Sequence, residues 1–205
     1  KSEKVLKRII ERVEASRQKE KPLSAAIGDL KGLIASRMRN NTAYESTETG
    51  HSIQVGLGSE SAYVNEINSN KSSLIIFNHK ARYNNDRDIE IFSRLKPGED
   101  STAPSIQDIN PYKSRNGIFK DKYFKLKPNV PCKTITAHMR LDCNMYIHPN
   151  QGRGLTVREA ARVQGFPDNY VFCGTLQAMY RQVGNAVPPP LAKILASAIY
   201  PEVSK

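Results

Sequence analysis

The sequence predicts a mixed α/β protein in which a small β-containing region is followed by carboxy-terminal helices. Three observations support this. Residues 3–19 place apolar side chains at helical spacing, residues 101–150 are rich in Pro, Asn and Gly, and the last fifty residues carry clear helix start and stop signals. We therefore divide the chain into an amino-terminal helix at residues 1–21, a middle region at 22–152 and a helical region at 153–205.

The amino-terminal helix is expected to lie on the surface. Val5, Ile9 and Val13 fall on one face, Lys and Arg occupy the other, and Pro22 ends the segment. Residues 40–70 are polar with scattered apolar positions, which favours loops around short strands.

Two further elements are expected before residue 100. Residues 74–77 have the composition of a buried strand. Residues 86–95 fit a short helix with Ile89, Phe92 and Leu95 facing inward, ended by the Pro-Gly pair that follows. Residues 101–150 favour short strands joined by irregular loops, and we expect this region to supply the small β-containing unit.

The carboxy-terminal helices are the best specified. Thr156 and Glu159 form a capping-box pattern that begins a helix, and Gly165 ends it. A second helix is predicted over residues 175–183. A third begins at Pro188, since proline suits a first turn.

The last helix carries an apolar stripe that must be buried against something. Its members are Leu191, Ile194, Leu195, Ala198 and Ile199. Packing within this chain is the default explanation, and a larger domain outside it is the alternative.

The net charge of +11 at pH 7 and the sequence pI near 9.6 indicate a polyanionic partner. Residues 110–140 contain eight basic side chains and one acid, interleaved with Tyr and Phe, which resembles a surface that follows a nucleic-acid backbone. Nucleic acid is the preferred partner; a membrane surface or an acidic protein fits the charge as well. No apolar stretch is long enough for a membrane span, so we expect an intracellular, cytoplasmic protein.

The three cysteines, Cys132, Cys143 and Cys173, show neither a disulfide framework nor metal-ligand spacing. We interpret them as reduced thiols and expect no metal site.

Two long motifs near the carboxyl end resemble a known family. Residues 153–168 read RGLTVREAARVQGFPD, which is similar to the ninth motif of DNA (cytosine-5) methyltransferases. Residues 181–189 read RQVGNAVPP, which resembles the tenth motif at the family's spacing. Upstream, residues 133–137 and 146–149 are similar to the end of the family's target-recognition region. The resemblance covers residues 22–200 and is strongest in the last fifty.

The resemblance implies that this chain is the DNA-reading portion of such an enzyme and lacks the residues that catalyse methyl transfer. The family's Gly-rich cofactor loop, Pro-Cys-Gln nucleophile, Glu-Asn-Val acid motif and Gln-Arg-Arg-type motif do not occur in these 205 residues. Pro131-Cys132 is followed by Lys and falls in the recognition region, so we expect Cys132 to be structural and no residue here to be catalytic. The helices of residues 153–205 would pack on a Rossmann-like catalytic domain that is largely absent from this chain, carried by a preceding segment or a separate subunit.

The resemblance also assigns roles. A cytosine must be extruded from the duplex before its C5 can be methylated, so the enzyme needs a region that holds the DNA. Our candidates near base edges are Thr134, Thr136, His138 and Arg140, and our candidates for phosphate contacts are Lys127 and Lys133. For each of these six, an ordinary surface position is the competing interpretation.

The tenth motif implies that Asn185 and Ala186 approach S-adenosylmethionine, most of which would be bound by the missing portion. On the residues alone, Gly184-Asn185 is a helix C-cap, since both tolerate a left-handed backbone. In the ninth motif we expect Glu159 to complete the capping box and Arg158 and Arg162 to form salt bridges. The competing function is a stand-alone basic DNA-binding module without catalysis.

Overall fold

The computed structural model describes residues 2–39, 43–56, 58–69, 75–115, 118, 122–141 and 144–204. Its α-helices and strands are α1 (Ser2–Ala15), α2 (Leu23–Ile27), β1 (Gly50–Val55), α3 (Ala62–Ile67), β2 (Ile75–Lys80), α4 (Asp86–Arg94), α5 (Val157–Val163), α6 (Leu176–Asn185) and α7 (Pro189–Val203). Short 3-10 helices are η1 (Pro104–Ile106), η2 (Lys113–Arg115), η3 (Ala137–Arg140) and η4 (Asn144–Tyr146). The fold is mixed α/β, as predicted.

The sheet consists of β1 and β2, which pair antiparallel with Ile53 opposite Phe77. The prediction of a buried strand at residues 74–77 is only partly right: Leu74 lies outside the described residues, and Ile75 is exposed. Ile76, Asn78 and His79 are the buried positions of β2, and the strand packs against α5.

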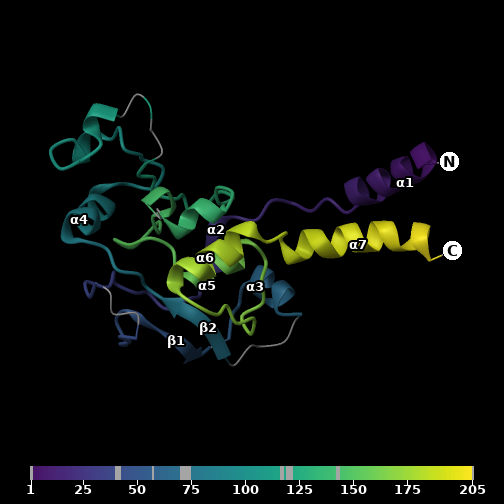
Figure 1. The fold of residues 1–205 in the computed structure, drawn as a ribbon, viewed down its shortest axis with the longest axis horizontal. Coiled ribbons are helices and arrows are strands. Elements are labelled where there is room, and N and C mark those ends of the chain that lie inside the picture. Colours follow the sequence, from purple (N-terminus) through teal and green to yellow (C-terminus); the bar gives the residue numbers. More distant parts are fainter. Residues whose placement is uncertain are drawn as a thin grey trace.

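The main hydrophobic core lies among α2, β2, α5 and α6, with α5 at its centre (Figure 1). Val157, Ala160 and Ala161 of α5 are almost completely buried. The two small alanines allow neighbouring elements to approach α5 closely, which explains why the short helix is surrounded on several sides.

A second, smaller core joins α4 to the segment that follows it. Ile91 and Phe92 of α4 are completely buried, and Phe92 meets Tyr123 edge to face at 6.2 Å between ring centroids. Burying an aliphatic or aromatic side chain of this size contributes about 1.5–3 kcal/mol. The helix predicted at residues 86–95 is confirmed at Asp86–Arg94. Phe92 and Leu95 are buried as expected, and Ile89 is half-buried.

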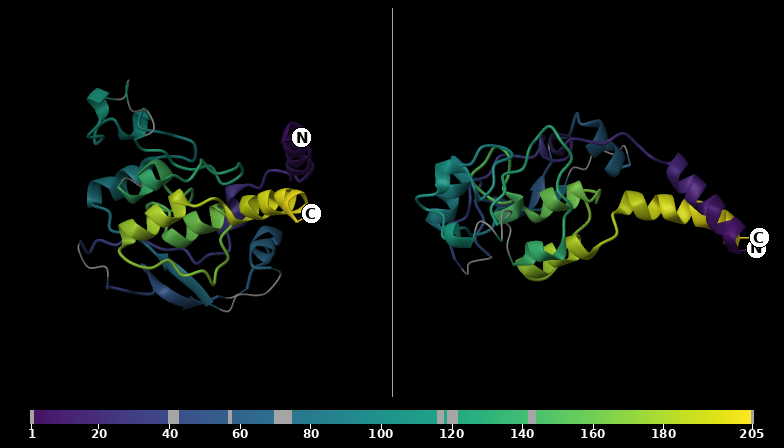
Figure 2. Two further views of the ribbon diagram at one scale, coloured as in Figure 1. Left: turned by 45° about the vertical axis from the view of Figure 1, so that its right-hand side comes forward. Right: turned by 90° about the horizontal axis from the view of Figure 1, so that it is seen from above.

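α1 and α7 lie side by side and project away from the body, so that both chain ends lie at the tip of this arm (Figures 1 and 2). Arg8 and Arg12 of α1 form ion pairs with Glu202 of α7. The amino-terminal helix is confirmed, but it ends at Ala15 and not at residue 19.

Two predictions for the middle of the chain were wrong in detail. Within the described residues, the region 101–150 contains 3-10 helices and isolated bridges, and the two-stranded sheet lies upstream of it. Residues 40–70 include the helix α3, which begins at the cap residue Ser61. Because α3 lies in a polar segment and is started by the side-chain cap of Ser61, the sequence shows no apolar periodicity that would predict this helix.

The three carboxy-terminal helices were predicted correctly. Thr156 caps α5 with the complete capping box, and α7 begins after Pro188. The expectation of a C-cap at Gly184-Asn185 was wrong. α6 continues to Asn185, its cap residue is Ala186, and Gly184 lacks the positive φ of a left-handed cap.

Candidate nucleic-acid interface

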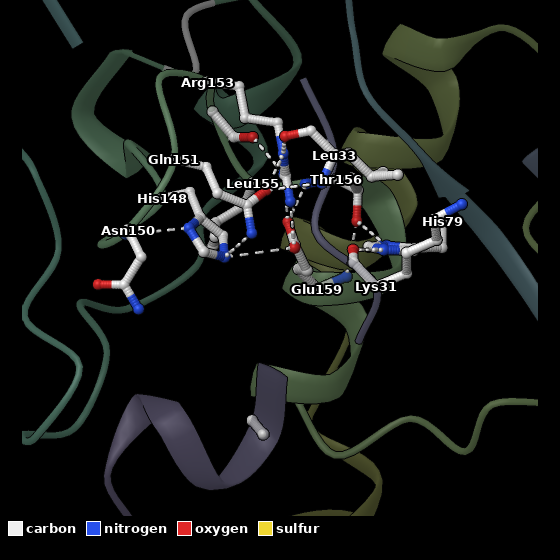
Figure 3. Close-up of polar contacts among 12 residues, drawn as sticks. Lys31, Leu33, His79, His148, Asn150, Gln151, Arg153, Leu155, Thr156 and Glu159 are labelled. Atoms are coloured by element: carbon white, nitrogen blue, oxygen red, sulfur yellow. Dashed lines mark hydrogen bonds and ion pairs between the residues drawn. The ribbon is translucent and has the colours of Figure 1, made fainter. Parts of the chain in front are cut away.

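The start of α5 is fixed by a buried ion pair between Arg153 and Glu159 (Figure 3). The guanidinium donates to both carboxylate oxygens of Glu159, at 2.8 and 2.7 Å. The backbone N–H of Thr156 donates to the same carboxylate at 2.7 Å, which completes the capping box. Burial alone would raise the pKa of Glu159, but the charge and hydrogen bonds of Arg153 outweigh it and hold the pKa well below its usual value.

Two histidines flank this ion pair. His79 of β2 lies with Nδ1 3.1 Å from the Thr156 hydroxyl and Nε2 2.9 Å from the Lys31 carbonyl oxygen. His148 accepts the backbone N–H of Asn150 at its Nδ1. Burial lowers the pKa of both imidazoles, that of His148 to about 4. Both rings are therefore neutral at pH 7, and they join β2 and the chain before α5 to the same network (Figure 3).

The two arginines within α5 have different partners. Arg162 forms ion pairs with Asp168 at 2.7 Å and with Asp29 at 2.5 Å, so the predicted salt bridge is confirmed. Arg158 instead donates to the carbonyl oxygens of Phe77, Pro167 and Tyr170, so the salt bridge expected for it was wrong. Burial lowers the pKa of Arg158 to about 10, still well above pH 7. The ninth motif thus organises the fold, as we expected of it.

The segment of predicted base-reading residues lies against α6. Gly184 of α6 faces the backbone of Thr136 and Ala137, and a Cβ at this glycine would overlap both. Ile135 and Met139 are buried and anchor the segment, which includes η3. The tenth motif therefore supports the candidate DNA-reading residues through a close backbone contact that requires glycine.

The candidates around this anchor are on or near the surface. Thr134, Thr136 and His138 are exposed, and Arg140 is half-buried. The Tyr146 hydroxyl donates to the Thr134 carbonyl oxygen at 2.7 Å and lies 3.3 Å from the Thr136 hydroxyl. The structure brings these four candidates together at η3.

The two lysine candidates precede this segment in the chain. Lys127 is exposed, and its aliphatic stem crosses Gly98. Lys133 is half-buried with its Nζ 4.6 Å from the centre of the Phe124 ring, a cation–π contact. Lys122 similarly lies over Tyr112 at 5.0 Å. The interleaving of basic and aromatic residues that the sequence shows is thus a physical pairing of cations with rings.

The remaining candidates concern the cofactor and the cysteines. The Asn185 side chain is exposed at the end of α6, and the Ala186 N–H donates to the Val183 carbonyl oxygen. Burial raises the pKa of Cys132 to about 12, so the thiol stays protonated and does not resemble an activated nucleophile.

Cys132 and Cys173 are both free thiols, as predicted, and Cys143 lies outside the described residues. Among the residues that the structure describes, no cluster of three His, Cys, Asp or Glu side chains could hold a metal ion. Within the same ranges, no helix combines the length and the apolar composition needed to cross a bilayer.

Sequence reasoning missed two features of this region. The sequence did not predict that His79 and His148 are buried, because a single histidine in a short motif does not show which residues surround it. The close approach at Gly184 was masked by the cap pattern that Gly-Asn usually indicates.

Comparison with known proteins identifies the class. Residues 3–201 match the C-5 cytosine-specific DNA methylase family. The chain is 34% identical over 158 residues to the type II methyltransferase M1.HphI of Haemophilus parahaemolyticus, covering 74% of this chain and 38% of that protein. It is 33% identical over 147 residues to M.DdeI of Desulfomicrobium norvegicum, covering 64% of this chain and 34% of the relative.

The fold is similar to a crystal structure of a prophage-encoded DNA modification methyltransferase from E. coli. The TM-score is 0.59 at 20% identity, over 89% of this chain and 47% of that one. The chain belongs to the C-5 cytosine-specific DNA methylase family. Members of this family are transferases that act on DNA and use S-adenosylmethionine. The chain spans less than half the length of these relatives.

Proposed function

We propose that this chain is the DNA-recognition, carboxy-terminal portion of a cytosine-5 methyltransferase that methylates C5 of cytosine in duplex DNA. An amino-terminal catalytic portion, on a preceding segment or a separate subunit, would carry the nucleophile and most of the S-adenosylmethionine site. The observation that carries the proposal is the presence of the ninth and tenth motifs without the family's nucleophile and cofactor-loop motifs.

The arm formed by α1 and α7 supports this division. Leu195 is 37% exposed, Ile199 is 41% exposed and Leu6 is 58% exposed, so the arm leaves apolar side chains uncovered. Of the stripe predicted on α7, Ala198 is fully buried within the chain. An uncovered apolar surface of this kind marks an interface, and the missing catalytic portion is its proposed partner. Packing within the chain covers Ala198 and leaves Leu195 and Ile199 exposed.

The basic surface around η3 supports the DNA role. Lys127 and Lys133 would hold phosphates, and Thr134, Thr136, His138 and Arg140 would lie near base edges. Asn185 and Ala186 would complete the cofactor site from the end of α6. We propose the same three regions that the sequence suggests, residues 1–21, 22–152 and 153–205, and the main hydrophobic core spans the boundary between the last two.

Duplex binding at a series of salt concentrations tests the DNA role. Lys127→Gln removes one charge and keeps the first methylene groups of the side chain, so the slope of log affinity against log salt should fall by about one phosphate contact. Lys7→Gln, which removes an exposed charge from the arm, is the matched control and should leave the slope unchanged. Equal effects of the two changes would mean that binding depends on overall charge and not on this surface.

A further inference from the structure

A polar groove of about 430 Å³ adjoins the candidate DNA-reading segment. Leu141, the residue that caps η3, lines one side of it. Arg82 and Tyr83, which lie just before α4, line another part, and Tyr112 and Lys122 come from the basic aromatic segment. The groove thus joins three stretches of the chain that are far apart in the sequence, beside the residues proposed to read bases.

The two cations of this groove are partly exposed and are held in place by aromatic rings. The Arg82 guanidinium carbon lies 5.8 Å from the centre of the Tyr180 ring of α6, and the Lys122 Nζ lies 5.0 Å from the centre of the Tyr112 ring. Tyr112 in turn packs on the buried Tyr123 at 5.8 Å between ring centroids. Because cation–π contacts already restrict both side chains, less conformational entropy is lost when they bind a ligand.

The charge of the groove favours an anion. Asp88, the acid among its lining residues, accepts the Tyr123 hydroxyl at one oxygen and the Asn85 side-chain amide at the other, each at 2.9 Å. Against this one negative charge the lining includes the positive charges of Arg82 and Lys122. The described lining therefore carries a formal excess of positive charge, which attracts a phosphate.

Tyr83 adds a neutral donor to the same place. Its side chain is partly exposed, and its hydroxyl makes no hydrogen bond to another residue of the ranges that the structure describes. Phosphate oxygens accept hydrogen bonds from guanidinium, ammonium and hydroxyl groups, and these three types meet here. The donor set therefore fits a phosphate of the DNA backbone.

We propose that this groove binds one phosphate of the duplex, with Arg82 and Lys122 as charged donors and the Tyr83 hydroxyl as a third donor. Because Leu141 directly follows η3, the phosphate belongs to a nucleotide close to the bases that η3 would read. The inference rests on the proposed function. It adds a backbone contact from residues that precede Lys127 and Lys133 in the sequence.

The first test changes the DNA and is made on the enzyme assembled with its catalytic portion. Uncharged methylphosphonate linkages replace the phosphates, one position at a time, in a duplex that this enzyme methylates. The unsubstituted enzyme should lose about tenfold in affinity at one position. Arg82→Gln and Lys122→Gln should bind the ordinary duplex more weakly and show no further loss there. Lys19→Gln, at an exposed position between α1 and α2, is the control and should keep both the affinity and the loss.

The second test separates charge from hydrogen bonding. Lys122→Gln should reduce the slope of log affinity against log salt by about one phosphate contact. Tyr83→Phe removes a hydroxyl and no charge, so affinity should fall about threefold at an unchanged slope. Tyr170→Phe, at an exposed tyrosine, should change neither.

The two proposals fail in different ways. If Arg82→Gln and Lys122→Gln lose as much affinity as the unsubstituted enzyme at every methylphosphonate position, the groove does not hold a phosphate and this inference is wrong, although the DNA role stands. If the assembled enzyme binds and methylates no duplex, the proposed function fails and the inference fails with it.

Discussion

The Glu159 carboxylate is buried away from solvent. It remains ionised because the Arg153 guanidinium binds both of its oxygens. A charge in this position is stable only while its partner is present. The same carboxylate caps the helix that carries the ninth motif, so one residue links the ion pair to the geometry of α5. Loss of this carboxylate should therefore disturb both the ion pair and the start of α5.

Glu159→Gln should destabilise the chain by about 3–5 kcal/mol, because it leaves the buried Arg153 guanidinium without its counter-charge. The free energy of unfolding from urea titration measures this. Glu20→Gln, at an exposed position between α1 and α2, is the control and should change it by less than about 0.5 kcal/mol. A loss below 1 kcal/mol at Glu159 would show that the ion pair is not essential.

The two buried histidines make stability depend on pH. The pKa of His148 is about 4 in the folded chain, against 6.5 for an ordinary histidine. Between these values the unfolded chain binds more protons, so stability falls as the pH drops from 6.5 towards 4, by up to about 1.4 kcal/mol per pH unit. Glu159 adds a loss in the same direction below its ordinary pKa of 4.5.

His148→Gln should therefore reduce the slope of unfolding free energy against pH between 4 and 6.5. Urea titrations at several pH values measure this slope. His138→Gln, at an exposed imidazole, serves as the comparison and should keep the original slope. An unaltered slope in His148→Gln would mean that its proton is not coupled to folding.

At the scale of elements, the contact between η3 and α6 joins the proposed recognition region to the segment that resembles the tenth motif. Gly184→Ala should force the two apart, because the new Cβ would overlap the backbone of Thr136 and Ala137. We expect a loss of about 1–3 kcal/mol in stability together with weaker duplex binding. Gly32→Ala, where the nearest atom to a new Cβ is 3.7 Å away, should affect neither. Retained stability and DNA affinity in Gly184→Ala would contradict the account.

Local signals explain which elements could be predicted. The capping box at Thr156 and the proline before α7 act within one helical turn, so the sequence alone located these helices. The position of the sheet and the close approach at Gly184 depend on partners far away in the chain. The η3 candidates could be grouped because they lie close together in the sequence, whereas the burial of His79 and His148 became visible only in the structure.

At the scale of the whole molecule, the arm of α1 and α7 is the proposed contact with the catalytic portion. Leu195→Asp places a charge on its exposed apolar surface and should weaken association with that portion by at least about tenfold, because an apolar side chain contributes about 1.5–3 kcal/mol when buried. Sedimentation of the mixed portions measures this. Ser204→Asp adds the same charge at an exposed polar position of the arm and should have little effect. Undiminished association of Leu195→Asp would place the contact elsewhere.

Transfer of labelled methyl groups from S-adenosylmethionine to mixed-sequence duplex DNA tests the central claim most directly. The chain is assayed alone and together with its amino-terminal catalytic portion. The account predicts methylated cytosine only when both are present. Methylation by this chain alone would contradict it and make Cys132 the first residue to replace, whereas DNA binding without methylation in either case would favour the stand-alone binding module.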